Sequence, residues 1–151
     1  MSHEWSRGDE YEISDDRARV DDDRVTAFIG GTYWAKGVPR AVMVRALDHS
    51  LVFGIYHATL GQVGLARVVT DRATFAYLCD VYLAPKHRGR GLGKWLVEVI
   101  AAHPDLQGLR RWMLLTADAH SLYEKIGFRR IEAADRYMER HFPDIYQKEN
   151  P

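Results

Sequence analysis

Residues 81–94 have the sequence Val-Tyr-Leu-Ala-Pro-Lys-His-Arg-Gly-Arg-Gly-Leu-Gly-Lys. An apolar strand at residues 78–83 leads into a turn at Pro85, and a helix with one apolar face follows and ends before Pro104. Glycine permits positive φ and a close approach of the backbone to a ligand. Free N–H groups at the N-terminus of a helix bind phosphate. The stretch therefore predicts a strand–loop–helix unit with a phosphate site in its loop.

The spacing of the glycines separates this loop from two common phosphate loops. A nucleotide P-loop has four residues between its first glycine and Gly-Lys, followed by Ser or Thr, whereas the glycines here are closer and Trp95 follows. A dinucleotide loop has the spacing Gly-x-Gly-x-x-Gly, whereas the glycines here alternate. We expect the contacts to come, mainly through main-chain N–H groups, from Arg88, Gly89, Arg90, Gly91, Leu92, Gly93 and Lys94. A solvated basic surface is the alternative.

Two motifs together carry a family resemblance. Arg88, Gly91 and Gly93 match the pattern Arg/Gln-x-x-Gly-x-Gly, and residues 119–128 match Ala-x-x-Leu-Tyr-x-x-x-Gly-Phe. In this order and at this separation they resemble the GNAT superfamily of N-acetyltransferases, whose first motif binds the pyrophosphate of acetyl-CoA. The resemblance covers roughly residues 10–140.

Hydrophobic periodicity predicts an α/β domain with a mixed sheet. The expected order is β-α-α-β-β-β-α-β-α-β-β, and the resemblance implies a single GNAT-like domain whose mostly antiparallel sheet is flanked by helices. The expected strands are 11–13, 51–56, 62–70, 74–83, 111–115 and a final hairpin of 128–131 with 137–140; the expected helices are 21–30, 40–49, 92–103 and 118–126. We expect a flexible N-terminus at 1–10, an acetyltransferase domain at 11–140 and a C-terminal tail at 141–151.

Composition limits the classes of function. The chain has 151 residues, with 21 Lys and Arg against 21 Asp and Glu, which argues against a general binder of nucleic acids or membrane surfaces. Cys79 is the single cysteine, so the chain cannot form an internal disulfide. The N-terminus is polar and no apolar run has the length of a membrane span, so we expect a cytoplasmic protein.

Two residues are candidates for proton transfer. The resemblance implies that Tyr123 protonates the departing thiolate of CoA, and an ordinary tyrosine, with a pKa of about 10, keeps its proton at neutral pH. Asp80 lies in an apolar strand, where a carboxylate is costly to bury unless it is paired or functional. The resemblance implies that Asp80 takes a proton from the amine, directly or through water. A packing role for Tyr123 and an ion pair between Asp80 and Arg67 are the alternatives.

The resemblance also implies contacts to the rest of the cofactor. The main chain of Val81, Tyr82 and Leu83 would hydrogen-bond the pantetheine arm as an added strand does, and an N–H near Val81 would stabilise the oxyanion. Thr116 stands where the family often has Asn, and its hydroxyl can still form a hydrogen bond to the cofactor.

The walls of the acceptor site are expected to be aromatic. Tyr33, Trp34, Phe75 and Tyr77, together with Arg67, fall in segments that line this site in the family, where aromatic rings suit an apolar or cationic acceptor. Plain core packing is the alternative. The histidines at 49, 57, 87, 103, 120 and 141 show no ligand spacing, so we predict no metal. Nothing indicates an activated Cys79, which disfavours a covalent acyl-enzyme.

The sequence thus predicts an acetyl-CoA-dependent N-acetyltransferase that works by direct attack. Acetyl-CoA is its co-substrate, and the acceptor is an amine on a small molecule or a peptide. Whether the chain forms a homodimer stays open. The alternative is a binding domain that holds an acyl-CoA as a sensor or scaffold without turnover.

Overall fold

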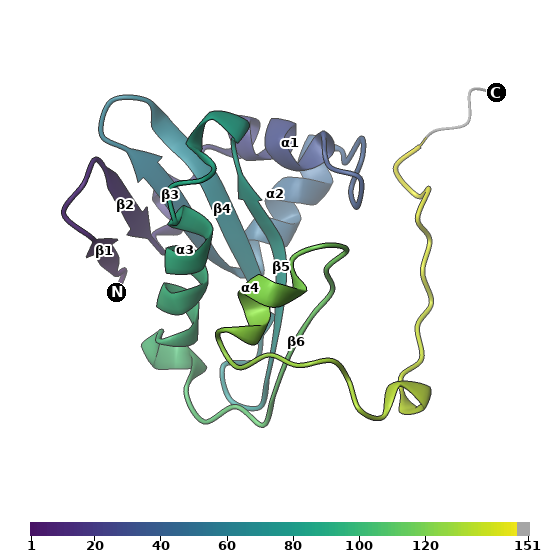
Figure 1. Ribbon diagram of the computed structural model, residues 1–151. Coiled ribbons are helices and arrows are strands. Elements are labelled where there is room, and N and C mark those ends of the chain that lie inside the picture. Colours follow the sequence, from purple (N-terminus) through teal and green to yellow (C-terminus); the bar gives the residue numbers. More distant parts are fainter. Residues whose placement is uncertain (148–151) are drawn as a thin grey trace.

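The computed structural model describes residues 1–147 and contains one six-stranded sheet (Figure 1). Its strands are β1 (Glu4–Ser6), β2 (Tyr11–Ser14), β3 (Leu51–His57), β4 (Gly61–Thr70), β5 (Phe75–Leu83) and β6 (Arg111–Leu114). Their order in space is the order in the chain. All neighbours are antiparallel except β5 and β6, which are parallel. The predicted α/β class with a mixed, mostly antiparallel sheet is confirmed.

Helices cover both faces of the sheet. They are α1 (Asp22–Gly30), α2 (Arg40–Asp48), α3 (Leu92–Ala101) and α4 (His120–Glu124), with short 3-10 turns at Arg17–Arg19, Pro85–His87, Pro104–Leu106 and Ala134–Arg136. The side chain of Asp21 accepts a hydrogen bond from the Arg24 N–H at 2.9 Å, which caps α1. Pro39 precedes α2, where a missing N–H costs nothing. The first two helices lie behind the sheet in Figure 1, and α3 and α4 lie in front of it.

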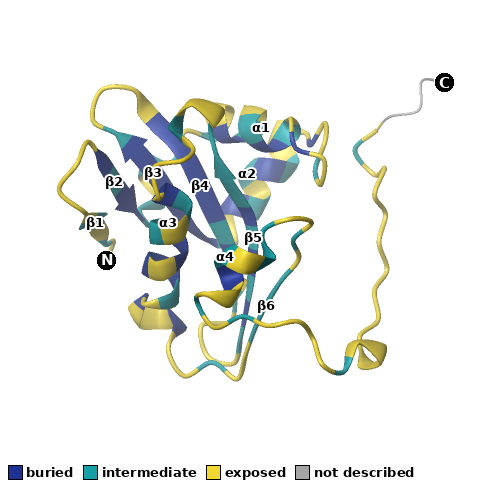
Figure 2. Cartoon of the chain, in the orientation of Figure 1, coloured by how far each residue is buried: buried dark blue, intermediate teal, exposed yellow. Residues whose placement is uncertain are grey.

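Two hydrophobic cores fill the space between these layers. The core on the α3 side includes Phe53, Ile55 and Leu96, and the core on the α1–α2 side includes Ile29, Leu47 and Leu65. Strands β3 and β4 are buried on both faces, and they form the dark centre of Figure 2. Burial of this apolar area is the main source of stability. The packed core also holds the central strands rigidly in place.

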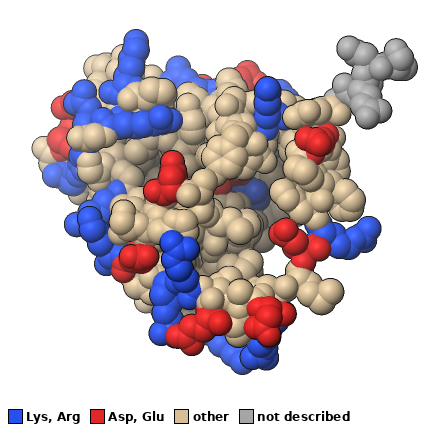
Figure 3. Space-filling view, turned by 45° about the vertical axis from the view of Figure 1, so that its right-hand side comes forward, with Lys and Arg blue, Asp and Glu red and all other residues tan. Residues whose placement is uncertain are grey.

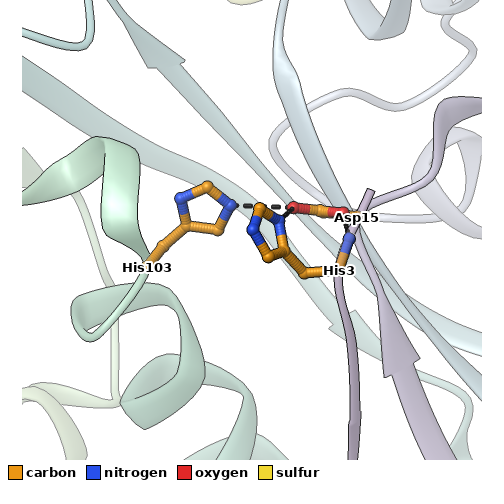
Figure 4. Close-up of side chains that lie close together, drawn as sticks. All are labelled: His3, Asp15 and His103. Carbon is orange, nitrogen blue, oxygen red and sulfur yellow. Dashed lines mark hydrogen bonds and ion pairs between the residues drawn. The ribbon is translucent and has the colours of Figure 1, made fainter. Parts of the chain in front are cut away.

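The N-terminus is more ordered than predicted, because residues 4–6 form β1 and pair with β2. Trp5 packs on Phe53 with ring centroids 5.9 Å apart. Asp15, which follows β2, accepts a hydrogen bond from the His3 N–H, one from His3 Nδ1 at 2.9 Å and one from His103 Nε2 at 2.8 Å (Figure 4). The prediction of a flexible segment at 1–10 was wrong for this strand, since one Trp and one His among polar residues give no periodic signal.

The C-terminal hairpin was also predicted incorrectly. Within residues 1–147, neither 128–131 nor 137–140 is a strand, and the chain there is irregular apart from the turn at Ala134–Arg136. Ile131 and Met138 are exposed, so this segment buries too little apolar surface to stabilise a two-stranded hairpin. Helix α4 is shorter than predicted and is followed by Gly127, whose φ is +99°.

Among residues 1–147, no helix combines the length and the apolar composition that crossing a lipid bilayer requires.

Candidate active site

The sheet opens between β5 and β6. The two strands pair from Phe75 with Arg111 to Leu78 with Leu114, after which β5 continues to Leu83 and β6 ends. The opening thus lies at the carboxyl ends of two parallel strands, which is the usual position of ligand sites in α/β sheets. A cleft of about 800 Å³ occupies it and extends to the α1–α2 loop. Figure 3 shows a hollow on this face, beside the C-terminal segment.

A β-bulge places Asp80 at the floor of this cleft. Leu65 pairs with Tyr82 but Arg67 pairs with Cys79, so two residues of β5, Asp80 and Val81, lie opposite one residue of β4. Asp80 has φ +52°, in the left-handed region that Asp tolerates better than most residues. The bulge redirects the side chain, and the residue is buried at the cleft floor, with 9% of its surface exposed.

Both carboxylate oxygens of Asp80 accept hydrogen bonds from the protein. Arg67 Nε donates to Oδ2 at 2.8 Å, and Trp34 Nε1 donates to Oδ1 at 2.9 Å. Arg67 Nη1 also donates to the Ser50 hydroxyl at 3.1 Å. The ion pair between Asp80 and Arg67, the alternative to a role in proton transfer, therefore forms. Each oxygen keeps a second lone pair, so a role in proton removal stays a prediction.

Tyr123 enters the same cleft from α4. The residue is buried, and its ring packs edge-to-face on Phe128 with centroids 5.9 Å apart. Burial raises the pKa of the Tyr123 hydroxyl, so the group keeps its proton at neutral pH. Within residues 1–147 the hydroxyl has no hydrogen-bond partner, which leaves it available to a ligand. These properties fit a proton donor, although the role itself stays a prediction.

Cys79 also lines the cleft but is a poor nucleophile. Burial raises the pKa of its thiol to about 12; Arg67 lowers it and Asp80 raises it further. The reactive form of cysteine is the thiolate, so Cys79 stays in its unreactive form near neutral pH.

The glycine loop lies between β5 and α3, as predicted. Gly89 has φ +78° and Gly91 has φ +75°, a region that other residues enter only with strain. Gly91 is the N-cap of α3 and provides no side chain to cap the first N–H groups of the helix. A Cβ atom on Gly89 would meet nothing within 4 Å. The glycines therefore serve the backbone path, and uncapped N–H groups remain for an anion.

The basic side chains near this loop have other partners. Arg88 Nε donates to the Leu83 carbonyl at 2.9 Å, and Lys94 lies 3.7 Å from a carboxylate oxygen of Glu98. Arg7, which the sequence analysis missed, donates to the Arg90 carbonyl at 3.0 Å and lies 5.2 Å from the centre of the Trp95 ring. No sequence signal links Arg7 to a loop more than eighty residues away.

Most predicted acceptor-site residues do meet in the cleft. Its lining includes Tyr33, Trp34, Arg67 and Tyr77, and it also includes Thr116, which was predicted to contact the cofactor. The Thr116 hydroxyl accepts a hydrogen bond from the Ala119 N–H at 3.0 Å and so positions the start of α4. Phe75 does not line the cleft, because it lies at the first pair of β5 and β6. The sequence analysis missed Asp118, Glu139, His141 and Tyr146, which also line it; the last two fall in the predicted tail.

The cluster of His3, Asp15 and His103 lies outside this cleft. Its ligand-type atoms lie within 4.8 Å of one another. However, His103 Nδ1 accepts a hydrogen bond from the Asp105 N–H at 3.1 Å, so its Nε2 carries the proton that is donated to Asp15. A metal-bound histidine normally donates from its second nitrogen. This arrangement therefore fits a hydrogen-bonded clamp for β1.

Comparison with known proteins gives the family of the chain. The profile of the acetyltransferase (GNAT) domain matches residues 48–130. A candidate acetyltransferase of Gibberella zeae is 36% identical to the chain, and the match covers 80% of the chain and 79% of the relative. The crystal structure of a candidate GNAT acetyltransferase from Xanthomonas campestris pv. campestris has a TM-score of 0.89 and 45% identity, covering 93% of this chain and 99% of that one.

The fold extends to more distant proteins. Glucosamine-6-phosphate N-acetyltransferase from Arabidopsis thaliana has a TM-score of 0.65 at 18% identity, covering 89% of this chain and 99% of that one, which shows a shared fold only. The family itself rests on the profile match, the Gibberella relative and the Xanthomonas structure. The chain belongs to the GNAT family of acetyltransferases.

Proposed function

We propose that the protein transfers the acetyl group of acetyl-CoA to a primary amine by direct attack, without an acyl-enzyme. The observation that carries this proposal is the opening between β5 and β6, where Asp80 and Tyr123 line one cleft. Strand β5, which carries Asp80, ends at Leu83 and is followed by the glycine loop. Holding the reactants in the right geometry supplies much of the rate of a two-substrate reaction.

Acetyl-CoA would bind along β5. Its pyrophosphate would accept hydrogen bonds from the loop at residues 88–94, where the N-terminus of α3 is uncapped. Its pantetheine arm would lie along Val81–Leu83, because β5 has no strand partner on the β6 side beyond Leu78 in the part of the chain that the structure describes. An added strand gains main-chain hydrogen bonds at such an edge. The thioester would then reach the bulge.

The chemistry needs two proton transfers. The amine nitrogen forms a C–N bond with the thioester carbonyl carbon, and its proton leaves to Asp80 or to a bound water. A main-chain N–H near Val81 would stabilise the oxyanion of the intermediate. The C–S bond then breaks, and Tyr123 gives its proton to the departing thiolate. Tyr123 then recovers a proton from solvent, and Asp80 or the bound water releases the amine proton to solvent, which returns the site to its starting state.

The remaining parts of the proposal concern partners and location. The acceptor is an amine on a small molecule or a peptide, and equal numbers of basic and acidic residues support a protein that binds neither nucleic acid nor a membrane surface. A cytoplasmic location rests on the single cysteine, which cannot form an internal disulfide.

An assay of thiol release tests the proposal. The protein is mixed with acetyl-CoA and a panel of primary amines, and free CoA thiol is measured with time. We expect release above the background rate only when an acceptor is present. Binding of CoA by calorimetry, with no release for any amine, would instead support the sensor or scaffold alternative.

A further inference from the structure

The C-terminal segment at residues 137–146 forms one wall of the cleft. At its start the Tyr137 ring lies 5.7 Å from the guanidinium carbon of Arg111 on β6. At its end Tyr146 packs against the core of α1 and α2, and a Cβ atom on Gly37 would lie 3.5 Å from its carbonyl oxygen. The segment therefore spans from the edge of the sheet to the α1–α2 loop, along the right-hand side of Figure 1. Glu139 lies between these two anchors and lines the cleft.

The charges that face the cleft are not balanced. On the sheet, Arg67 and Asp80 pair with each other and cancel. Asp118, after β6, and Glu139, on the C-terminal segment, both line the cleft, and neither forms an ion pair within residues 1–147. Among the residues that the structure describes, His141 is the only other basic side chain of the cleft lining. Clefts lined by one sign of charge concentrate ligands of the opposite sign.

Aromatic rings add a second feature that favours cations. Tyr33 and Trp34 lie at the mouth in an edge-to-face pair with centroids 5.1 Å apart, and Tyr77 lines the same cleft. Tyr33 is 74% exposed, so its ring is open to a ligand. Ammonium groups are attracted to the faces of such rings.

We infer that the preferred acceptor carries two amines, one that is acetylated and a second that stays protonated and is bound by Glu139, Asp118 and the aromatic rings. This inference rests on the proposed function and names its substrate class. Only the neutral form of the first amine attacks the thioester. The second keeps its charge near neutral pH, because an alkyl ammonium group has a pKa of about 10. Glu139 thus determines specificity and takes no part in proton transfer.

Three acceptor series of equal chain length test this inference, because they differ only at the far end: α,ω-diamines, alkylamines and ω-amino acids. We expect kcat/KM to fall in that order. Glu139→Gln should lower kcat/KM for the diamines about threefold to fivefold, as expected for an exposed charge pair, and leave the alkylamines unchanged. Asp118→Asn together with Glu139→Gln should have a larger effect. Asp144→Asn removes an exposed carboxylate from the same segment but outside the cleft, and it should change none of the series.

Binding of the same amines to the CoA-loaded protein, measured by calorimetry, separates the inference from the proposed function on which it rests. If diamines bind more tightly than alkylamines and Glu139→Gln removes the difference, the inference holds, even if no thiol is released and the proposed function fails. If thiol is released but the far-end charge has no effect on binding or turnover, the inference is wrong and the proposed function stands. If none of the amines binds and none of them causes thiol release, both the inference and the proposed function are wrong.

Discussion

The glycine loop before α3 and the cleft between β5 and β6 are connected through β5 but are built in different ways. The loop is one continuous stretch, residues 88–94, and its key groups belong to the main chain. The cleft combines side chains from segments between Ile29 and Tyr146, and its central group, Asp80, depends on donors from two other elements. A site made of local backbone tolerates changes of side chain, whereas a site made of dispersed side chains does not. The predictions below test this difference.

The largest effect is expected in the cleft, for Tyr123→Phe. The ring and its contact with Phe128 are kept, and only the proton donor is lost. Turnover should fall roughly 10²–10⁴-fold if release of the thiolate limits the rate. The dissociation constant for acetyl-CoA should change little. Steady-state kinetics and calorimetry measure the two effects.

The pH dependence gives a second measure for the same variant. Burial raises the pKa of Tyr123, so the acid form persists to higher pH than for an ordinary tyrosine. If this residue sets the fall in rate at alkaline pH, that fall should disappear in Tyr123→Phe. Turnover close to that of the unchanged protein would assign Tyr123 to packing.

The next effect concerns the cluster of His3, Asp15 and His103 that clamps β1. Arg7 follows β1 directly and contacts the glycine loop. Asp15 is nearly fully buried and accepts bonds from His3 and His103, so Asp15→Asn should lower the free energy of unfolding by about 2 kcal/mol at neutral pH. The affinity of the folded variant for CoA should change only slightly, because the loop is held by its own backbone. Chemical denaturation and calorimetry measure the two quantities.

The contribution of Asp15 should also depend on pH. Burial alone would raise the pKa of this carboxyl, but hydrogen bonds from the His3 N–H, His103 and the His3 side chain lower the pKa below its ordinary value. A group with a lowered pKa in the folded state stabilises the fold above its unfolded pKa and loses this effect as pH falls through the folded value. The difference in stability between the two proteins should therefore be full at pH 7 and shrink as pH falls below about 4, the ordinary pKa of Asp. A constant difference down to low pH would contradict this assignment.

In the glycine loop, Gly91→Val should weaken CoA binding at least tenfold, which corresponds to about 1.4 kcal/mol. A β-branched residue at φ +75° strains the path that exposes the first N–H groups of α3. Gly108→Val is the matched control, since Gly108 has φ +71° and lies outside the loop. Both variants should lose stability, but only Gly91→Val should lose affinity. Equal affinity in the two folded variants would remove the phosphate assignment.

The smallest effect is expected for Arg7→Ala, a change of side chain beside the loop. Arg7 pairs with Asp9 at 2.6 Å and is also held by the Arg90 carbonyl and the Trp95 ring, so its charge lies near the proposed phosphate position. The dissociation constant for CoA should rise about threefold, as for an exposed ionic contact. Arg129→Ala removes a charge that pairs with Glu132 and lies on a more exposed side chain, 80% against 26% for Arg7, and it should have no effect. A tenfold loss for Arg7→Ala would show that side chains matter as much as the backbone.

The difference between a loop made of local backbone and a cleft made of dispersed side chains also explains what could be predicted from the sequence. The glycine loop, α3 and the middle strands follow from local periodicity and turn residues, and the structure places them where they were expected. The bond from Trp34 to Asp80 depends on a bulge and on a loop far away in the chain, so no local pattern carries it. Arg7 and Glu139 could not be predicted for the same reason. The N-terminal strand was missed because its stability comes from Asp15 and Phe53, which are tertiary contacts.

The agreement between strand order and chain order has a consequence for folding kinetics. Strands β1 to β5 form a meander whose neighbours are close in sequence, apart from the α1–α2 insertion, and local pairings form quickly because little loop entropy is lost. The pairing of β6 with β5 must wait for α3 to cross the sheet, and it is the only parallel pair within residues 1–147. We therefore expect the glycine loop to acquire its shape with the meander and the cleft to be completed in the last step of folding.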